Sequence, residues 1–217
     1  ADHSYDRYAI ANSLAIKEER LWEILSRAGK RSIVIGVPGT YPPKPLNGLM
    51  VTDFLTPDIT CEYTHPPELK KEIADVVGEY ILDVRDFRSG NKAKILADIY
   101  EMTRKRFQLA RHLIQKEDWD YFMMVEMGTD RIHHALWDNM DPAHRFYEKG
   151  NEFESAIHDY YIEVDREIGE LLKLVDDNTD VLVVSDHGPK RMERGLCGNE
   201  GVSEAGNLRI GWKTEGA

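Results

Sequence analysis

Asp186 and His187 are adjacent residues of metal-ligating types, and they lie between the apolar run Val181–Val184 and Gly188. Neighbouring strand residues point to opposite faces, so two adjacent ligands can serve one metal only where a strand ends. A carboxylate oxygen together with an imidazole nitrogen suits zinc, manganese or iron better than calcium, which prefers oxygen ligands. The pair predicts half of a metal site, while a turn-forming Asp and a surface His after a core strand are the simpler alternative.

A second pair of the same residue types occurs earlier in the chain. The apolar residues 119–127 predict a buried strand, and Asp130 and His134 follow it with DxxxH spacing. This spacing places both side chains on one face if a helix begins there, so they could share a cation. His133 points about 100° away on such a helix and is expected to be structural or to support a ligand. DxxxH alone is a weak signal, but two pairs at strand ends indicate one site, because ligands of open α/β sheets collect at that edge.

Both motifs resemble those of the alkaline-phosphatase superfamily and, within it, the type I phosphodiesterase/nucleotide pyrophosphatase group. The family's strand-borne SDHG is similar to Ser185–Gly188, and its DxxxH is similar to Asp130–His134, in the same order. Residues 21–43 also resemble the family's helix, strand and Pro-Gly loop. The resemblance covers most of the chain and is most specific at residues 120–137 and 181–198.

The resemblance implies a hydrolase of phosphodiester or pyrophosphate bonds that uses two divalent metal ions. Asp130 and His134 would hold one ion, and Asp186 and His187 the other, with zinc as the first expectation and manganese or iron as alternatives. The implied substrate is a small phosphate ester or a nucleotide-like molecule. A metal pair of this kind stabilises the attacking and leaving oxygens of an in-line displacement and activates a hydroxyl nucleophile.

Departures from the family pattern concern the two ends of the chain. The resemblance places the Thr or Ser nucleophile upstream of residue 1 and a further His ligand downstream of residue 217. We therefore expect an internal fragment of a catalytic domain that is inactive, or nearly so, on its own. Thr40 superficially resembles the family's nucleophile segment, but it follows the first helix and strand, which favours a loop that lines the site.

Two alternative functions stay open. A phosphomonoesterase, a sulfatase or a phosphoglycerate-mutase-like enzyme of the same superfamily would use the same metal pairs. A non-catalytic α/β domain would keep the scaffold for binding or assembly only. An upstream Cys or Ser that can become formylglycine would indicate a sulfatase, and the lack of the upstream Thr or Ser or of the downstream His would favour the non-catalytic domain.

Other polar side chains near the motifs have weaker claims to a role. Lys190 and Arg191 could neutralise a phosphate or form a solvated loop pair. Asp138 could orient the His134 imidazole or be an ordinary exposed carboxylate. Surface positions are expected for His144 and His158.

Composition narrows the classes of partner. The net charge of −11 argues against binding to a nucleic-acid polymer, whereas carboxylates attract cations. No apolar stretch approaches the roughly 20 residues that span a bilayer, so a cytoplasmic location is the default and export stays open. Cys61 and Cys197 give neither a disulfide framework nor a CxxC metal signature.

The alternation of apolar patterns predicts a single α/β domain over residues 1–217. Helices are expected at 17–28, 67–79, 91–116 and 151–176, and strands at 31–37, 49–54, 119–127 and 180–185. Strands separated by helices predict a mostly parallel sheet with helices on both faces, and the resemblance makes it alkaline-phosphatase-like and incomplete at both ends. Residues 38–67 hold most of the nine prolines and are expected to be irregular, forming a cap or a substrate-facing loop, and 195–217 is expected to be a mobile tail.

Overall fold

The structure is a computed structural model that describes residues 11–85, 87 and 89–192. Helices and strands are mixed along the chain but do not strictly alternate, since β1, β2 and β3 are consecutive, as are α2 and α3 and also α4 and α5. In chain order they are a short 3-10 helix η1 (Ser13–Ala15), α1 (Leu21–Arg27), β1 (Ser32–Ile35), β2 (Gly48–Val51), β3 (Thr64–His65), α2 (Leu69–Val77), α3 (Lys92–Lys116), β4 (Tyr121–Met124), α4 (Gly128–Met140) and α5 (Ala156–Leu172).

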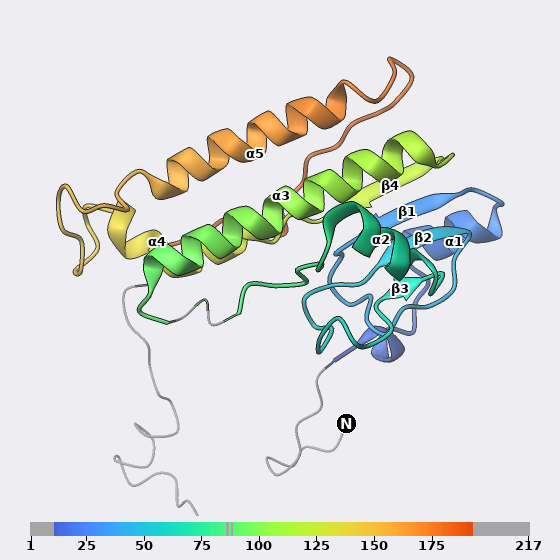
Figure 1. Cartoon of the computed structure of the whole chain (residues 1–217), viewed down its shortest axis with the longest axis horizontal. Coiled ribbons are helices and arrows are strands. Elements are labelled where there is room, and N and C mark those ends of the chain that lie inside the picture. Colours follow the sequence, from blue (N-terminus) through green and yellow to red (C-terminus); the bar gives the residue numbers. More distant parts are fainter. Residues whose placement is uncertain (1–10, 86, 88, 193–217) are drawn as a thin grey trace, which may run out of the picture.

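The strands form a four-stranded sheet in the order β3-β2-β1-β4 (Figure 1). β1 pairs in parallel with β2 on one side and with β4 on the other, and Val34 lies in register with Met50 and Met123. The two-residue β3 pairs antiparallel with β2 and has no counterpart in the sequence prediction. The prediction of a mixed α/β fold with a mostly parallel sheet is confirmed.

Alternate residues of β1 face opposite sides of the sheet, as strand geometry requires. Ile33 and Ile35 pack into a core with α2 and α3, whereas Val34 packs with Trp22 of α1. All three of these β1 side chains are fully buried, and burial of such a side chain contributes roughly 1.5–3 kcal/mol. Helices therefore cover both faces, as predicted.

A second core lies where α3 extends beyond the sheet and packs against α4 and α5. Phe107 of α3, Ile132 and Leu136 of α4, and Tyr160 of α5 are buried there. α3 and α5 lie side by side along the long dimension of the molecule, and α4 lies at one end of them (Figure 1). This packing fixes the helix that begins directly after β4.

The expected strand at residues 180–185 is wrong for this structure. Residues 177–192 contain no helix or strand, and Leu182, Val183 and Val184 are 80–87% exposed. An apolar β-branched run favours a strand only if a neighbouring strand accepts its backbone hydrogen bonds, and β4 is hydrogen-bonded to β1 alone in the described sheet. β4 itself is half-buried rather than fully buried, because it is an edge strand.

The proline-rich residues 38–67 include the predicted strand β2 and one strand that was not predicted, β3. None of the described helices is long and apolar enough to cross a membrane. Cys61 is a free thiol, whereas Cys197 and the predicted tail at 195–217 lie outside the described residues.

Candidate metal centre

A cavity of about 580 Å³ brings both predicted ligand pairs together. Asp130 and His134 enter it from α4, and Asp186 and His187 enter it from the segment that follows residue 184. The remaining lining residues are Thr129, His133, Ala135, Trp137, Asp138, His144, Tyr161, Ser185, Gly188, Pro189, Lys190 and Met192. Residues 38–67 are not among them, so this cavity is not covered by the predicted cap region.

The pair on α4 has the geometry that its spacing predicted. Asp130 and His134 lie one helical turn apart, and the distance from Asp130 Oδ1 to His134 Nε2 is 3.4 Å. Two ligands of a tetrahedral zinc with bonds of about 2.0–2.1 Å are separated by about 3.3 Å. The two atoms are therefore spaced as neighbouring ligands of one small cation would be.

The second pair is similar in spacing but differs in setting. Asp186 Oδ2 and His187 Nε2 are 3.6 Å apart, and their side chains are 89% and 71% exposed. The pair lies on an irregular segment instead of a strand end, where the Ser185 hydroxyl donates to the His187 carbonyl at 2.6 Å. Within the described part of the chain, the hydrogen bonds of Asp186 and His187 are thus local ones.

The donor chemistry fits two divalent cations, because each pair offers one carboxylate and one imidazole. Among residues 11–85, 87 and 89–192, no group of three or more His, Cys, Asp or Glu side chains could hold a metal. Each pair would therefore fill two coordination positions of a cation and leave the others to further ligands.

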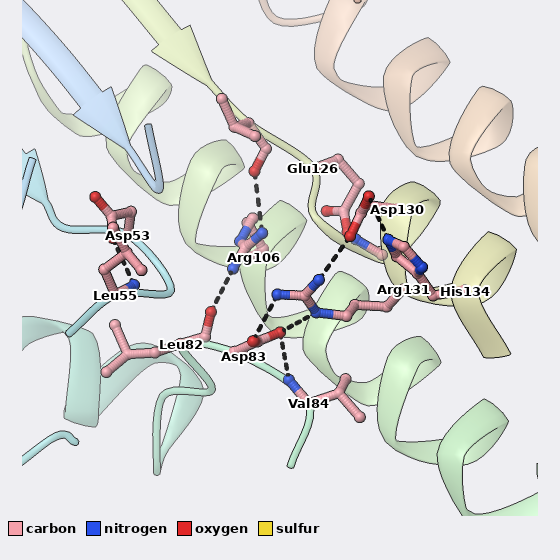
Figure 2. Close-up of polar contacts among 12 residues, drawn as sticks. Asp53, Leu55, Leu82, Asp83, Val84, Arg106, Glu126, Asp130, Arg131 and His134 are labelled. Carbon is pink, nitrogen blue, oxygen red and sulfur yellow. Dashed lines mark hydrogen bonds and ion pairs between the residues drawn. The ribbon is translucent and has the colours of Figure 1, made fainter. Parts of the chain in front are cut away.

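The Asp130 carboxylate is hydrogen-bonded to the guanidinium of Arg131, a residue that the sequence prediction did not single out. Arg131 Nη1 donates to Asp130 Oδ2 at 2.6 Å, while Arg131 Nε and Nη2 donate to the two oxygens of Asp83, each at 2.7 Å (Figure 2). Burial lowers the pKa of Arg131, but the hydrogen bonds and charges of Asp83 and Asp130 outweigh it and raise the pKa above its ordinary value. Local spacing gave no signal for Asp83, which lies far from Arg131 in sequence.

The start of α4 is fixed by a buried network around Glu126. Glu126 Oε1 accepts hydrogen bonds from Gly128 N at 2.8 Å, from Thr103 Oγ1 at 3.1 Å and from the Tyr160 hydroxyl at 3.2 Å. Burial, followed by the Glu126 charge, raises the pKa of Tyr160. A side chain at Gly128 would meet the Tyr160 hydroxyl at 1.9 Å, so glycine is required there.

Three aromatic rings form one wall of the cavity. The His133 ring lies 5.7 Å from that of Trp137 and 5.6 Å from that of Tyr161. Burial lowers the pKa of His133, and the Asp130 charge offsets part of this effect. This packing agrees with the predicted structural role of His133. His144, which was expected on the surface, also lines the cavity.

Thr40 is not placed to act as a nucleophile at this cavity. It is fully buried, its hydroxyl donates to the Val37 carbonyl at 2.7 Å, and its backbone N–H donates to Asp53 Oδ2 at 2.7 Å. Thr40 therefore stabilises the turn after β1, and it does not line the cavity.

The remaining polar residues that the sequence analysis considered differ in whether they line the cavity. Asp138 is bound by Lys92, whose Nζ lies 2.7 Å from Oδ2, so this carboxylate has a partner other than His134. Lys190 lines the cavity, whereas Arg191 pairs with Asp141 at 3.3 Å. His158 is exposed beside Asp159, as expected.

Comparison with known proteins gives one match. The family model described as "Type I phosphodiesterase / nucleotide pyrophosphatase" matches residues 2–216, a span that contains both ligand pairs. No curated protein and no solved structure matches the chain.

Proposed function

The chain belongs to the type I phosphodiesterase/nucleotide pyrophosphatase family of the alkaline-phosphatase superfamily, and we propose that it is a metal-dependent hydrolase of phosphodiester or pyrophosphate bonds. The family itself supports a hydrolase of the phosphodiesterase and nucleotide-pyrophosphatase type. One observation carries the metal dependence, namely that a single cavity is lined by both Asp-His pairs. A lone pair would be an ordinary feature of a solvated helix or turn.

In this proposal Asp130 and His134 hold one divalent cation, and Asp186 and His187 hold the other. Zinc suits the mixed oxygen and nitrogen donors, and manganese or iron are the alternatives. When bound, two such cations stabilise the attacking and leaving oxygens of an in-line displacement at phosphorus.

The residues of the cavity fit a small anionic substrate. The cavity volume of about 580 Å³ is in the usual range for sites that bind small molecules. Lys190 lines the cavity and can donate to phosphate oxygens. A small phosphate ester or a nucleotide-like molecule is therefore the proposed substrate class.

The nucleophile is not assigned to a residue of the cavity. Thr129 and Ser185 supply its aliphatic hydroxyl groups, but Thr129 donates to the Glu126 carbonyl at 3.0 Å and Ser185 to the His187 carbonyl at 2.6 Å. Both hydroxyls are thus used by the local backbone. The proposal therefore assigns the metal ligands and leaves the nucleophile open.

The test is a calorimetric titration of the purified chain with Zn²⁺, carried out for wild type, Asp130→Asn and Asp186→Asn. We expect weak binding by wild type, because catalytic zinc sites generally use three protein ligands and each pair supplies two. Each substitution should weaken the binding by at least about tenfold, as loss of groups in a metal site typically does.

His158→Ala is the matched control, since His158 is an exposed imidazole beside an Asp and does not line the cavity. It should bind Zn²⁺ as wild type does. The proposal is overturned if wild type binds no Zn²⁺, or if Asp130→Asn, Asp186→Asn and His158→Ala all bind it equally well.

A further inference from the structure

We infer that Arg131, held in place by Asp83, is a positioning residue that fixes the Asp130 carboxylate as a one-oxygen metal ligand. The inference rests on the proposed function, because it concerns the same metal centre. It assigns roles to two residues that lie outside the predicted ligand set.

The contacts form a continuous chain from Asp83 to His134 (Figure 2). Asp83 binds Arg131 through two parallel hydrogen bonds of 2.7 Å, and Arg131 Nη1 binds Asp130 Oδ2 at 2.6 Å. Oδ1, the other oxygen of Asp130, faces His134 Nε2 at 3.4 Å. One carboxylate oxygen is thus committed to Arg131, and the other is directed toward the partner ligand.

The Arg131 guanidinium has little freedom to do anything else. Its side chain is only 8% exposed, and its carbon Cζ lies 5.3 Å from the ring centre of Phe54 and 4.5 Å from that of Phe87. Asp83 is fixed in turn, since its Oδ1 accepts a hydrogen bond from Val84 N at 2.8 Å. A planar, two-pronged pair enclosed by rings holds its geometry better than an exposed ion pair. Arg131 therefore acts through Asp130 and does not contact a substrate.

Asp83 also determines the net charge of the group formed by Asp83, Arg131 and Asp130. Arg131 alone would neutralise Asp130 and reduce its attraction for a cation. With Asp83 included, the three side chains carry a net charge of −1, so Asp130 keeps its attraction. Removing the Asp83 charge should weaken cation binding even though Asp83 itself does not line the cavity.

Fixing a single oxygen has a consequence for which cations bind. Zinc accepts a carboxylate through one oxygen in a tetrahedral site, whereas calcium uses more oxygen ligands and often both oxygens of one carboxylate. As long as Arg131 occupies Oδ2, two-oxygen binding by Asp130 is blocked. Releasing Oδ2 should shift the preference toward calcium.

The experiment measures Zn²⁺ and Ca²⁺ affinities of the chain by calorimetry for wild type, Asp83→Asn and the double variant Asp83→Asn/Arg131→Gln. We expect Asp83→Asn to weaken Zn²⁺ binding about tenfold, as substitutions behind metal ligands do. In the double variant, which leaves no buried charge unpaired, we expect the ratio of Ca²⁺ to Zn²⁺ affinity to rise about tenfold. Circular dichroism establishes that each variant is folded.

Glu101→Gln is the matched control, because Glu101 also accepts two hydrogen bonds from one arginine, Arg104, but on the exposed face of α3. It should leave both affinities unchanged. If wild type binds Zn²⁺ and Asp83→Asn binds it equally well, the inference is overturned while the proposed function stands. An unchanged metal ratio in a folded double variant also overturns it. If wild type binds no Zn²⁺, both the inference and the proposed function fail.

Discussion

A carboxylate such as Asp130 can serve a cation only if its own neighbours leave one oxygen available. The DxxxH spacing predicted that Asp130 and His134 share a face, and the 3.4 Å between their side-chain atoms agrees with this. The same spacing gave no sign of Asp83, which lies 48 residues from Arg131 in the chain. Residue types and local spacing thus indicate which side chains carry the chemistry, while the groups that orient them come from distant parts of the chain.

Gly128 is a second residue whose role depends on a distant partner. We predict that Gly128→Ala lowers the free energy of unfolding by about 1–3 kcal/mol, because the new methyl group would overlap the Tyr160 hydroxyl and push apart the start of α4 and α5. Urea unfolding followed by circular dichroism measures the change.

Gly169→Ala on α5 is the control for Gly128→Ala. A methyl group at Gly169 would have no atom within 4 Å, so this helix-favouring change should stabilise the chain by roughly 0.5–1 kcal/mol. Equal effects of the two substitutions would refute a steric role for Gly128.

Among the elements, α3 was predicted more closely than the strands, for a physical reason, whereas α4 was anticipated only as a condition of the DxxxH spacing. α3 was expected at 91–116 and is observed at Lys92–Lys116, because its apolar stripe and its N-terminal Asn91 are both local signals. Strand formation also depends on a partner that the local sequence does not contain. The apolar residues 180–185 were therefore predicted as a strand and are unpaired here, and the two-residue β3 was missed.

The contact between Tyr63, which precedes β3, and Tyr80, which follows α2, predicts a pH effect on stability. Tyr63 and Tyr80 stack with their ring centres 6.0 Å apart, and burial, followed by the Tyr80 charge, raises the pKa of Tyr63 to about 12. An unfolded tyrosine loses its proton near about pH 10. Tyr63 therefore contributes stability that is complete below about pH 10 and is lost as the pH rises toward 12.

The variant Tyr63→Phe isolates this contribution. The free energy of unfolding should decrease between about pH 8 and about pH 11 in both proteins, and the decrease should be smaller in Tyr63→Phe than in wild type. Urea unfolding at the two pH values measures this difference. Parallel falls in both proteins would show that Tyr63 does not titrate differently in the folded chain.

At the scale of the whole molecule, order decreases from the sheet toward the segment that carries Asp186 and His187. β1 is hydrogen-bonded on both sides, β4 on one side, and residues 181–184 lie outside the sheet. The cavity is therefore lined on one side by residues of α4 and by Tyr161 of α5, and on the other by a segment that lies outside the sheet. The fold sets Asp130 and His134, the first proposed ligand pair, in place, whereas Asp186 and His187, the second proposed pair, are held mainly by local hydrogen bonds.

Hydrogen exchange should reproduce this order. Amides of β1 should exchange slowest, because opening them requires disruption of the sheet, and amides of residues 181–184 should exchange at rates close to those of an unstructured peptide. Mass spectrometry of peptic fragments measures the rates. Protection of residues 181–184 comparable to that of β1 would contradict an unpaired segment.

Because residues Val181–Val184 are exposed, the neighbouring aspartates have a second expected role, which is to oppose aggregation. An exposed, apolar, β-branched run is the type of segment that pairs with other chains and aggregates, and flanking charges act as gatekeepers against this. Asp180 and Asp186 are the charges on either side of the run. A substitution of Asp186 therefore removes a gatekeeper as well as a proposed ligand. Its effect on cation binding must be measured on monodisperse protein, so that loss of solubility is not taken for loss of binding.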